Sequence, residues 1–464
     1  MELTAVPTRA ASRSIAYADV RPTLARHLLA DGFSLVLDLE RSRGVDLVDG
    51  VTGRTYLDLF GFYASSALGM NHPKLLGDAA FLKRLQEAAL NKITNSDVYT
   101  PHMARFVDTF SRVGIPAELP YAFFVEGGAA AVENALKIAF DWKVRKNFAK
   151  GYRREVGHQV LHFDGAFHGR SGYTLSLTNT ADPRKTMYFP KFDWPRVENP
   201  YAEFPLAGVN LECTIRREGR ALEQAKRAFL ERKDDIACVI IEPVQSEGGD
   251  HHFRPEFLQA LKDLAHENDA LLIFDEVQTG VGITGEFWAY QGLGVVPDVL
   301  AFGKKTQVCG CLAGPKLDEV VGHVFQTSSR INSTWGGNLA DMVRFDKVLE
   351  VMEEDGLVAH AGRVGGYLQA QLAEMAGRHP SMSGVRGRGL LTAFDLPSAG
   401  FRNRVLDVCY DEGVVVLGSG THAVRFRPPL TITTAEIDRG LAILDRALTA
   451  VEAEDIDPSR KGRK

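Results

Sequence analysis

Four short runs of apolar residues in the middle of the chain constrain its fold most. They read YAFFVEGG (121–128), ACVIIEP (237–243), ALLIFDE (270–276) and DVLAFG (298–303), and helix-length segments such as RPEFLQALKDLAHEND (254–269) lie between them. Strands that are apolar throughout are typical of a parallel sheet covered by helices on both faces. We therefore predict an α/β protein. Because ligands bind at the carboxyl ends of the strands in such sheets, we expect the functional site there.

The chain of 464 residues is too long for one ordinary hydrophobic core, and its character changes near residue 340. Beyond that point the apolar pattern favours helices at 342–357 and 364–377, and short strands at 387–396, 413–420 and 423–433. We expect three parts, which are an N-terminal segment (1–75) packing with a small domain, a large ligand-binding domain (76–340) and a C-terminal small α+β domain (341–464).

The composition argues against several classes of function. A net charge of −5 and an isoelectric point near 6.3 give no basic surface for nucleic acid or an anionic membrane. Residues 1–20 lack the apolar core of a signal peptide, and no window reaches the roughly 18 to 20 apolar residues of a membrane-spanning helix. Five scattered cysteines are typical of reduced thiols, so we expect a cytoplasmic protein. The charged tail at 452–464 is expected to fray.

A glycine pair links the first apolar run to a predicted helix. The stretch VEGGAAAVENALK places Gly127 and Gly128 before a helix predicted over 129–145. Backbone N–H groups at a helix N-terminus bind phosphate, because they point at the anion and the helix dipole favours negative charge. The same arrangement is also an ordinary tight turn, so alone it indicates a phosphate site only weakly.

Charged residues end two further apolar runs. In LLIFDEVQTG, Asp275 follows a buried strand, where a carboxylate needs a helix N-terminus, a cation or a protonated heterocycle nitrogen as its partner. In AFGKKTQVCG, Lys304 and Lys305 follow the next run. Adjacent lysines are usually surface charge, but a partly desolvated lysine has a lowered pKa and forms a Schiff base with an aldehyde. A phosphate turn, a carboxylate for a pyridine nitrogen and a lysine for an aldehyde together predict pyridoxal 5′-phosphate as the cofactor.

With these motifs the sequence resembles the class III, fold-type I aminotransferases, which depend on pyridoxal 5′-phosphate. The resemblance covers nearly the whole chain and is carried by FFVEGGAAAVENALK, GAFHGRSGYTLSLTNT, FPKFDWPR, EPVQSEGGD, LLIFDEVQTG, AFGKKTQVCG, NSTWGGN and VRFRPPLT. It implies a large domain with a mostly parallel seven-stranded sheet covered by helices, and a smaller α+β domain built from both termini. It also implies a homodimer with shared active sites.

The resemblance selects Lys304 as the reactive lysine, because the family's Gly-Lys pair matches Gly303 and Lys304. Lys304 would form the Schiff base and later shuttle a proton, Asp275 would pair with the pyridine nitrogen, and Lys305 would be a flanking cation. Other residues implied at the cofactor are Gln278 on the ring hydroxyl, Phe167 and Val277 on the two ring faces, Gly128 and Ala129 on the phosphate through their backbone N–H groups, and Thr334 on the phosphate from the partner subunit.

The phosphate turn departs from the family in one respect. Many relatives carry Ser/Thr-Gly-x-Glu-Ala here, whereas this chain has Gly127, Gly128, Ala129 and Ala130. Side-chain contacts from the turn are therefore missing, and we expect phosphate binding to depend on backbone donors and Thr334. Gly127 is not assigned to the phosphate.

Within the family, HGRSGYT and FPKFDWPR resemble the branch that transfers the ε-amino group of lysine to 2-oxoglutarate. By this resemblance Arg170 would bind the carboxylate far from the cofactor, since a guanidinium binds a carboxylate through two parallel hydrogen bonds. Arg425 would bind the carboxylate beside the reacting carbon of 2-oxoglutarate, and Glu247 would neutralise Arg425 while lysine reacts. Gln278 and Asn332 would also lie near the substrate.

Alternative interpretations stay open. Another ω-aminotransferase, acting on ornithine, 4-aminobutyrate or a diamine, would carry the same cofactor residues. A pyridoxal-phosphate-dependent aminomutase or decarboxylase would have no need of both Arg425 and Glu247.

Three further charged or histidine motifs receive no catalytic role. Arg427 is interpreted as a structural or surface residue, and His168 as a packing or hydrogen-bonding residue. His251 and His252 lack the spacing of metal ligands, so no metal is expected.

Overall fold

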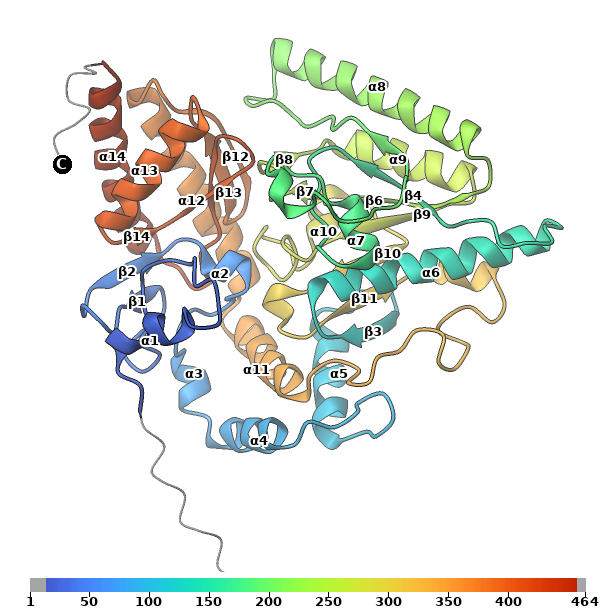
Figure 1. Cartoon of the computed structure of the whole chain (residues 1–464), viewed down its shortest axis with the longest axis horizontal. Helices are drawn as coiled ribbons and strands as arrows, with labels where there is room; N and C mark the ends of the chain where they lie inside the picture. The colour runs from blue at the N-terminus through green and yellow to red at the C-terminus, as the bar shows by residue number, and fades with distance from the viewer. Residues whose placement is uncertain (1–13, 457–464) are drawn as a thin grey trace, which may run out of the picture.

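The centre of the molecule is a seven-stranded sheet. A computed structural model describes residues 14–456 and shows this sheet with helices packed around it (Figure 1). Its strands, in spatial order, are β3 (Tyr121–Val125), β11 (Cys309–Ala313), β10 (Val299–Phe302), β9 (Leu271–Asp275), β6 (Ile236–Ile241), β4 (Gln159–Phe163) and β5 (Arg196–Val197). Only β11 runs against its neighbours, so the predicted mostly parallel sheet is confirmed.

Helices cover both faces of this sheet, because alternate residues of each strand point to opposite sides. On one side α6 (Gly128–Ala149) packs against residues such as Ala237, Ile273 and Ala301. On the other side α9 (Pro255–Glu267) and α5 (Pro101–Val113) pack in a larger core with Phe274 and Phe302. The four apolar runs are therefore strands, as predicted; β6, β9 and β10 are buried throughout, whereas β3 is buried only at Phe124 and Val125.

The C-terminal part holds a second sheet of four antiparallel strands. They are, in spatial order, β12 (Ser383–Arg388), β13 (Leu391–Asp395), β16 (Ala423–Phe426) and β15 (Leu417–Ser419). The same part of the chain contains the helices α12 (Leu357–Arg378), α13 (Ala399–Asp411) and α14 (Thr434–Ile456). The helices and strands expected beyond residue 340 are thus present.

The N-terminal segment joins this C-terminal part. Strands β1 (Asp46–Val48) and β2 (Thr55–Asp58) form a small sheet in which β14 (Val414–Val415) pairs with β2 in parallel. Helix α11 (Leu339–Glu354) packs on both α4 (Ala79–Leu90) and α5. The domain boundaries at 75 and 340 stay a prediction.

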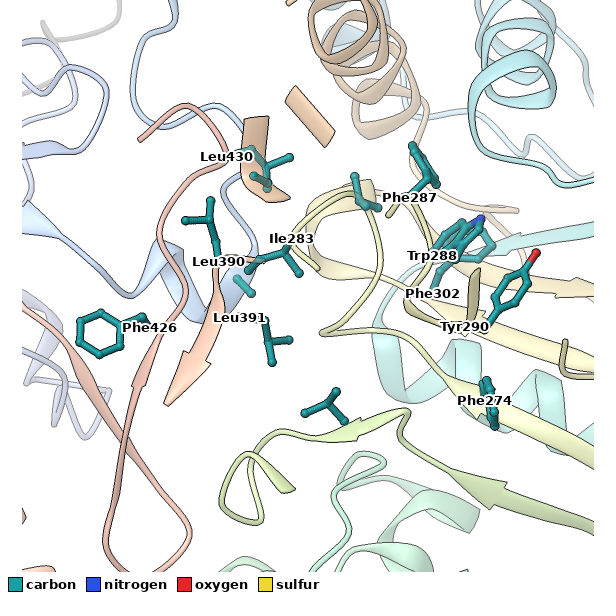
Figure 2. Packing of buried hydrophobic residues seen from close by; sticks show 14 of the residues in the cluster. Phe274, Ile283, Phe287, Trp288, Tyr290, Phe302, Leu390, Leu391, Phe426 and Leu430 are labelled. Carbon is teal, nitrogen blue, oxygen red and sulfur yellow. The ribbon is translucent and has the colours of Figure 1, made fainter. Parts of the chain in front are cut away.

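One apolar core connects the two halves. Figure 2 shows Phe274, Phe302 and Trp288 on the side of the large sheet and Leu391 and Phe426 on the C-terminal strands. The residues Ile283, Leu390 and Leu430 lie between them (Figure 2). This continuous packing sets the position of β16 relative to the carboxyl ends of β9 and β10.

The remaining helices and strands are α1 (Tyr17–Leu24), α2 (Gly61–Ala64), α3 (Pro73–Leu76), α7 (Gly172–Leu177), the long α8 (Gly208–Glu231), α10 (Ala289–Leu293), β7 (Val244–Gln245) and β8 (His251–His252). Among residues 14–456, no helix combines the length and the apolar character needed to cross a membrane. The expectations for the signal peptide and the charged tail fall partly on residues 1–13 and 457–464, which lie outside the described residues.

Candidate active site

A cavity of about 260 Å³ lies where several strands of the large sheet end. Its lining comes from the segments after β3, β4, β6, β9 and β10 and consists of Gly128, Ala129, Phe167, His168, Gly169, Glu242, Asp275, Val277, Gln278 and Lys304. All the residues expected at the cofactor therefore meet in one place, with the exception of Thr334. The cavity thus lies at the carboxyl ends of the strands, where the functional site was expected.

Asp275 ends β9, and its side chain is only 6% exposed. One carboxylate oxygen accepts a hydrogen bond from the backbone N–H of Val277 at 3.1 Å. The other lies 2.8 Å from Nδ1 of His168, whose backbone N–H is in turn held by Thr178. His168 therefore orients the carboxylate, in agreement with the predicted hydrogen-bonding role.

The neighbouring Glu276 has a different function. Its carboxylate accepts hydrogen bonds from the backbone N–H groups of Ala289 and Tyr290, at 2.7 and 2.9 Å, and from the hydroxyl of Thr279. Burial raises the pKa of Glu276 to about 7 despite these donors. Of the two acidic residues at this strand end, Glu276 caps α10 and Asp275 faces the cavity.

The two neighbouring lysines differ in the same way, since Lys304 lines the cavity and Lys305 does not. Lys304 lines the cavity and begins a 3₁₀ turn (Lys304–Thr306), with a backbone φ of 57° that non-glycine residues seldom adopt. Burial, followed by the positive charges of Arg425 and Arg427, lowers the pKa of Lys304 to about 8. About a tenth of such an amine is uncharged at pH 7, far more than for an ordinary lysine, and the uncharged form is the nucleophile.

Lys305 is fully buried and faces away from the cavity lining. Its Nζ donates hydrogen bonds to the backbone carbonyls of Ala64 and Gln278, both at 3.1 Å. Burial lowers its pKa well below the usual value. Lys305 is therefore a structural link between the N-terminal segment and the turn after β9.

The glycine turn expected to bind phosphate lies at one wall of the cavity. Gly127 has a φ of 93° and precedes α6, whose first residues, Gly128 and Ala129, line the cavity. A Cβ on Gly169, which has a φ of 125°, would come within 2.6 Å of the Ala129 Cβ. The close approach at Gly169 keeps the two loops together without a side chain between them.

Glu242 was not predicted to belong to the site. It ends β6 in the same way as Asp275 ends β9, and its carboxylate accepts hydrogen bonds from the backbone N–H groups of Phe167 and Ser246. Burial raises the pKa of Glu242 to about 7. Its place at the end of ACVIIEP was a signal of the same kind as that of Asp275, and it could have been used.

Arg425 and Glu247, predicted to interact, form an ion pair. Nη2 of Arg425 lies 2.8 Å from one carboxylate oxygen of Glu247, and the ring of Tyr63 lies 6.0 Å from the guanidinium carbon. Arg425 is only 3% exposed, and among residues 14–456 its Nε and Nη1 have no hydrogen-bond partner. Two buried donor atoms are thus available to a ligand.

The other oxygen of Glu247 contacts a second cation, Lys185, whose Nζ lies 2.6 Å away. Burial opposes ionisation of Glu247, but Arg425 and Lys185 together lower its pKa below the usual value. No pattern in the sequence pointed to Lys185, which lies in a loop segment 62 residues before Glu247.

Arg427, which was interpreted as a structural or surface residue, is a buried structural residue. It is fully buried, forms an ion pair with the equally buried Asp250, and donates a hydrogen bond to the carbonyl of Phe426 at 2.7 Å. Its Nε also approaches Oε1 of Gln278 at 3.4 Å. This arginine therefore connects the end of β16 to the cavity wall.

Besides Arg425 and Glu247, three more predicted residues lie outside the cavity lining. The side chains of Arg170, Asn332 and Thr334 are exposed. The loop that holds Asn332 and Thr334 is attached to the segment before α5, where the hydroxyl of Ser96 donates to the carbonyl of Ser333. The roles of these three residues stay predictions.

The histidine pair is part of a packed turn. His251 stacks on Tyr201 with ring centroids 4.2 Å apart, and His252 is buried. Within the part of the chain that the structure describes, no group of three His, Cys, Asp or Glu side chains is arranged to hold a metal ion.

The geometry defines the class of protein. Lys304, Asp275 and the N-terminus of α6 surround one cavity at the carboxyl ends of a mostly parallel sheet, and residues 30–448 match the family Aminotransferase class-III. The chain belongs to the class III aminotransferases. It is thus an enzyme of the fold-type I architecture, and its cofactor is pyridoxal 5′-phosphate.

Individual relatives lie close in sequence and structure. The chain is 57% identical to an L-lysine-epsilon aminotransferase of Mycobacterium tuberculosis over 434 residues, which are 93% of this chain and 96% of that protein. It is 54% identical to one from Amycolatopsis lactamdurans, with the same coverage of 93% and 96%. The solved structure of a lysine aminotransferase from M. tuberculosis matches with a TM-score of 0.92 at 55% identity, covering 94% of this chain and 100% of that one.

Proposed function

We propose that this protein transfers the ε-amino group of L-lysine to 2-oxoglutarate. The products are L-glutamate and L-2-aminoadipate 6-semialdehyde, which cyclises to piperideine-6-carboxylate. The observation that carries this proposal is the ion pair of Glu247 with Arg425, whose positive charge is near enough to Lys304 to lower the pKa of that lysine. The names of the relatives that are 54–57% identical support lysine as the donor.

The cavity residues fit the cofactor. The first turn of α6, with Gly128 and Ala129, presents backbone N–H groups for the phosphate, and the buried carboxylate of Asp275 suits the protonated pyridine nitrogen. Phe167 and Val277 would flank the ring, and Gln278 would reach its hydroxyl. When bound, pyridoxal 5′-phosphate supplies an aldehyde for the amine and an electron sink for the substrate carbon.

Lys304 would carry out the proton transfer. With a pKa of about 8, its Nζ can accept a proton from the ε-carbon of lysine and release it again near neutral pH. Lys304 is only partly exposed, which limits the access of water, and His168 would keep the Asp275 carboxylate in place during this step.

Glu247 would let one cavity accept two different substrates. While lysine reacts through its ε-carbon, the ion pair with Glu247 neutralises Arg425, and Arg170 would bind the distant α-carboxylate. When 2-oxoglutarate enters, its α-carboxylate would replace Glu247 on Arg425, whose Nε and Nη1 have no other partner among residues 14–456. Asn332 would contact the substrate in this arrangement.

The active unit would be a homodimer in the cytoplasm. Thr334 is exposed and lies outside the cavity of its own chain, which agrees with a role at the phosphate of the partner subunit. All five cysteines are free thiols, which supports a reducing compartment.

The proposed reaction is tested by incubating the purified holoenzyme with L-lysine and 2-oxoglutarate. We expect glutamate and the cyclised product to appear in equal amounts. Ornithine, 4-aminobutyrate and a diamine serve as competing donors. Glutamate formation with one of these but not with lysine would replace the proposed donor and leave the class unchanged.

Replacing Glu247 with glutamine is expected to slow the lysine half-reaction by about tenfold, because the Arg425 cation would then be unpaired near the reacting carbon. The reaction with 2-oxoglutarate should be unchanged or faster, since its carboxylate no longer competes with Glu247. Each half-reaction is followed in a stopped-flow instrument through the absorbance of the bound cofactor. Equal losses in both halves would show that Glu247 is not a gate for Arg425.

A further inference from the structure

Glu247 interacts with two cations at once, and only one of them belongs to the proposed substrate site. Arg425 contacts one carboxylate oxygen and Lys185 the other, at 2.8 and 2.6 Å. The side chain of Lys185 is only 16% exposed and that of Glu247 only 25%. The Nζ of Lys185 also lies 5.7 Å from the ring centroid of Phe167, which lines the cavity. Lys185 is thus at the edge of the site without lining it.

The position of Lys185 is fixed by the loop that carries it. Lys185 ends a 3₁₀ turn (Pro183–Lys185) whose first backbone N–H groups are capped by Asp182, which accepts from Arg184 at 3.1 Å. The turn continues into a segment where Lys191 donates to the carbonyls of Thr186 and Phe189. The backbone that carries Lys185 is therefore held by local contacts that do not depend on Arg425.

The two cations matter differently in the two half-reactions. While lysine reacts, Glu247 has both partners, so the loss of Lys185 leaves the ion pair with Arg425 intact. When the carboxylate of 2-oxoglutarate occupies Arg425, Glu247 loses that partner. A mostly buried carboxylate without a partner is costly, and Lys185 is the cation that remains in contact with it.

We infer that Lys185 is a positioning residue that holds the Glu247 carboxylate while Arg425 binds the acceptor, and so favours the second half-reaction. This inference rests on the proposed function, because it requires a dicarboxylate acceptor that displaces Glu247. The Glu247 carboxylate would contact both Arg425 and Lys185 while lysine reacts. It would contact Lys185 alone while 2-oxoglutarate occupies Arg425.

The test compares the two half-reactions of the Lys185→Met holoenzyme. We expect the reaction with 2-oxoglutarate to lose about tenfold in rate constant over apparent Kd, the size expected for one hydrogen bond to a charged group. The lysine half-reaction should lose no more than about twofold, because Arg425 still binds Glu247. Lys185→Arg, which restores a cation, should recover most of the loss.

Arg184→Met is the matched control. Arg184 precedes Lys185, is 81% exposed and forms its ion pair with Asp182, so the change removes the same charge from the same turn without touching Glu247. Both half-reactions of this variant should equal those of the wild type. A loss like that of Lys185→Met would mean that charge or loop structure, not the contact with Glu247, is responsible, and would overturn the inference.

A double-mutant cycle separates positioning from a direct role. In a Glu247→Gln background the Lys185→Met change should have little further effect on the 2-oxoglutarate step, because the carboxylate that Lys185 holds is gone. A loss that persists in that background would show that Lys185 acts on the acceptor itself or on Phe167, and would overturn the inference.

The outcomes also distinguish this inference from the proposed function. A wild-type enzyme that transfers no amino group to 2-oxoglutarate overturns both. An active wild type combined with equal losses in the two half-reactions of Lys185→Met overturns the role of Lys185 alone. If another amino donor replaces lysine, the same comparison is made with that donor.

Discussion

Replacement of Lys304 with alanine is expected to lower kcat by at least about 10⁴-fold, because in the proposed mechanism this one amine would serve as both nucleophile and proton carrier. The variant should also lose the long-wavelength absorbance of covalently attached cofactor, while phosphate binding at α6 persists. Both quantities are measured on purified protein reconstituted with pyridoxal 5′-phosphate. Covalent attachment that survives in Lys304→Ala would assign the reaction to another lysine.

Lys305→Met is the control for this experiment. Its amine binds two backbone carbonyls, so its loss should lower Tm by removing buried hydrogen bonds, and the covalent attachment of the cofactor should remain. If Lys305→Met instead abolished the attachment at an unchanged Tm, the assignment of the two neighbours would have to be exchanged.

Replacement of Asp275 with asparagine is expected to lower kcat by about 10² to 10³-fold, the range found when one preorganised electrostatic contact is removed from an active site. A neutral amide cannot stabilise a proton on the pyridine nitrogen, and its hydrogen bond with His168 changes as well. The kcat of the holoenzyme measures the effect, with cofactor saturation checked by titration.

Glu276→Gln provides the comparison for Asp275. Glu276 belongs to the same strand end, but it caps α10 and faces away from the cavity. Its substitution should reduce stability and leave the kcat of folded holoenzyme within about twofold, since it contacts no reacting group. If Asp275→Asn had no larger effect on kcat than Glu276→Gln, Asp275 could not be the partner of the pyridine nitrogen.

Much of the fold could be predicted because its strands are buried on both faces. A run such as LLIFD carries no alternation, and that pattern specifies a covered, mostly parallel sheet. The antiparallel strand β11 was not anticipated, since CGCLA is as uniformly buried as the parallel strand β9 and the direction of a strand leaves no mark on its composition. The direction of β11 follows from its connection to β10, which is a tight turn that begins at Lys304.

Residues of the candidate site could be predicted where their role follows from a position at the end of a strand. Asp275 and Lys304 end strands, and strand ends converge in a parallel sheet. Lys185 and the burial of Lys305 could not be predicted, because both depend on contacts between segments far apart in sequence, such as Lys305 with Ala64. Propensity and periodicity describe neighbours in sequence and contain no information about such pairs.

The apolar core shared by Phe302, Ile283 and Phe426 has a consequence for the rate of the catalytic cycle (Figure 2). It ties β16, which carries Arg425, to the strand that leads to Lys304, so the spacing between the two cations is built into the folded state. In the proposed mechanism, exchanging donor for acceptor would then require movement of the Glu247 side chain alone, and no closure of whole domains, which takes about microseconds to milliseconds. Such an enzyme would alternate between its amino donor and its dicarboxylate acceptor without a change in backbone conformation.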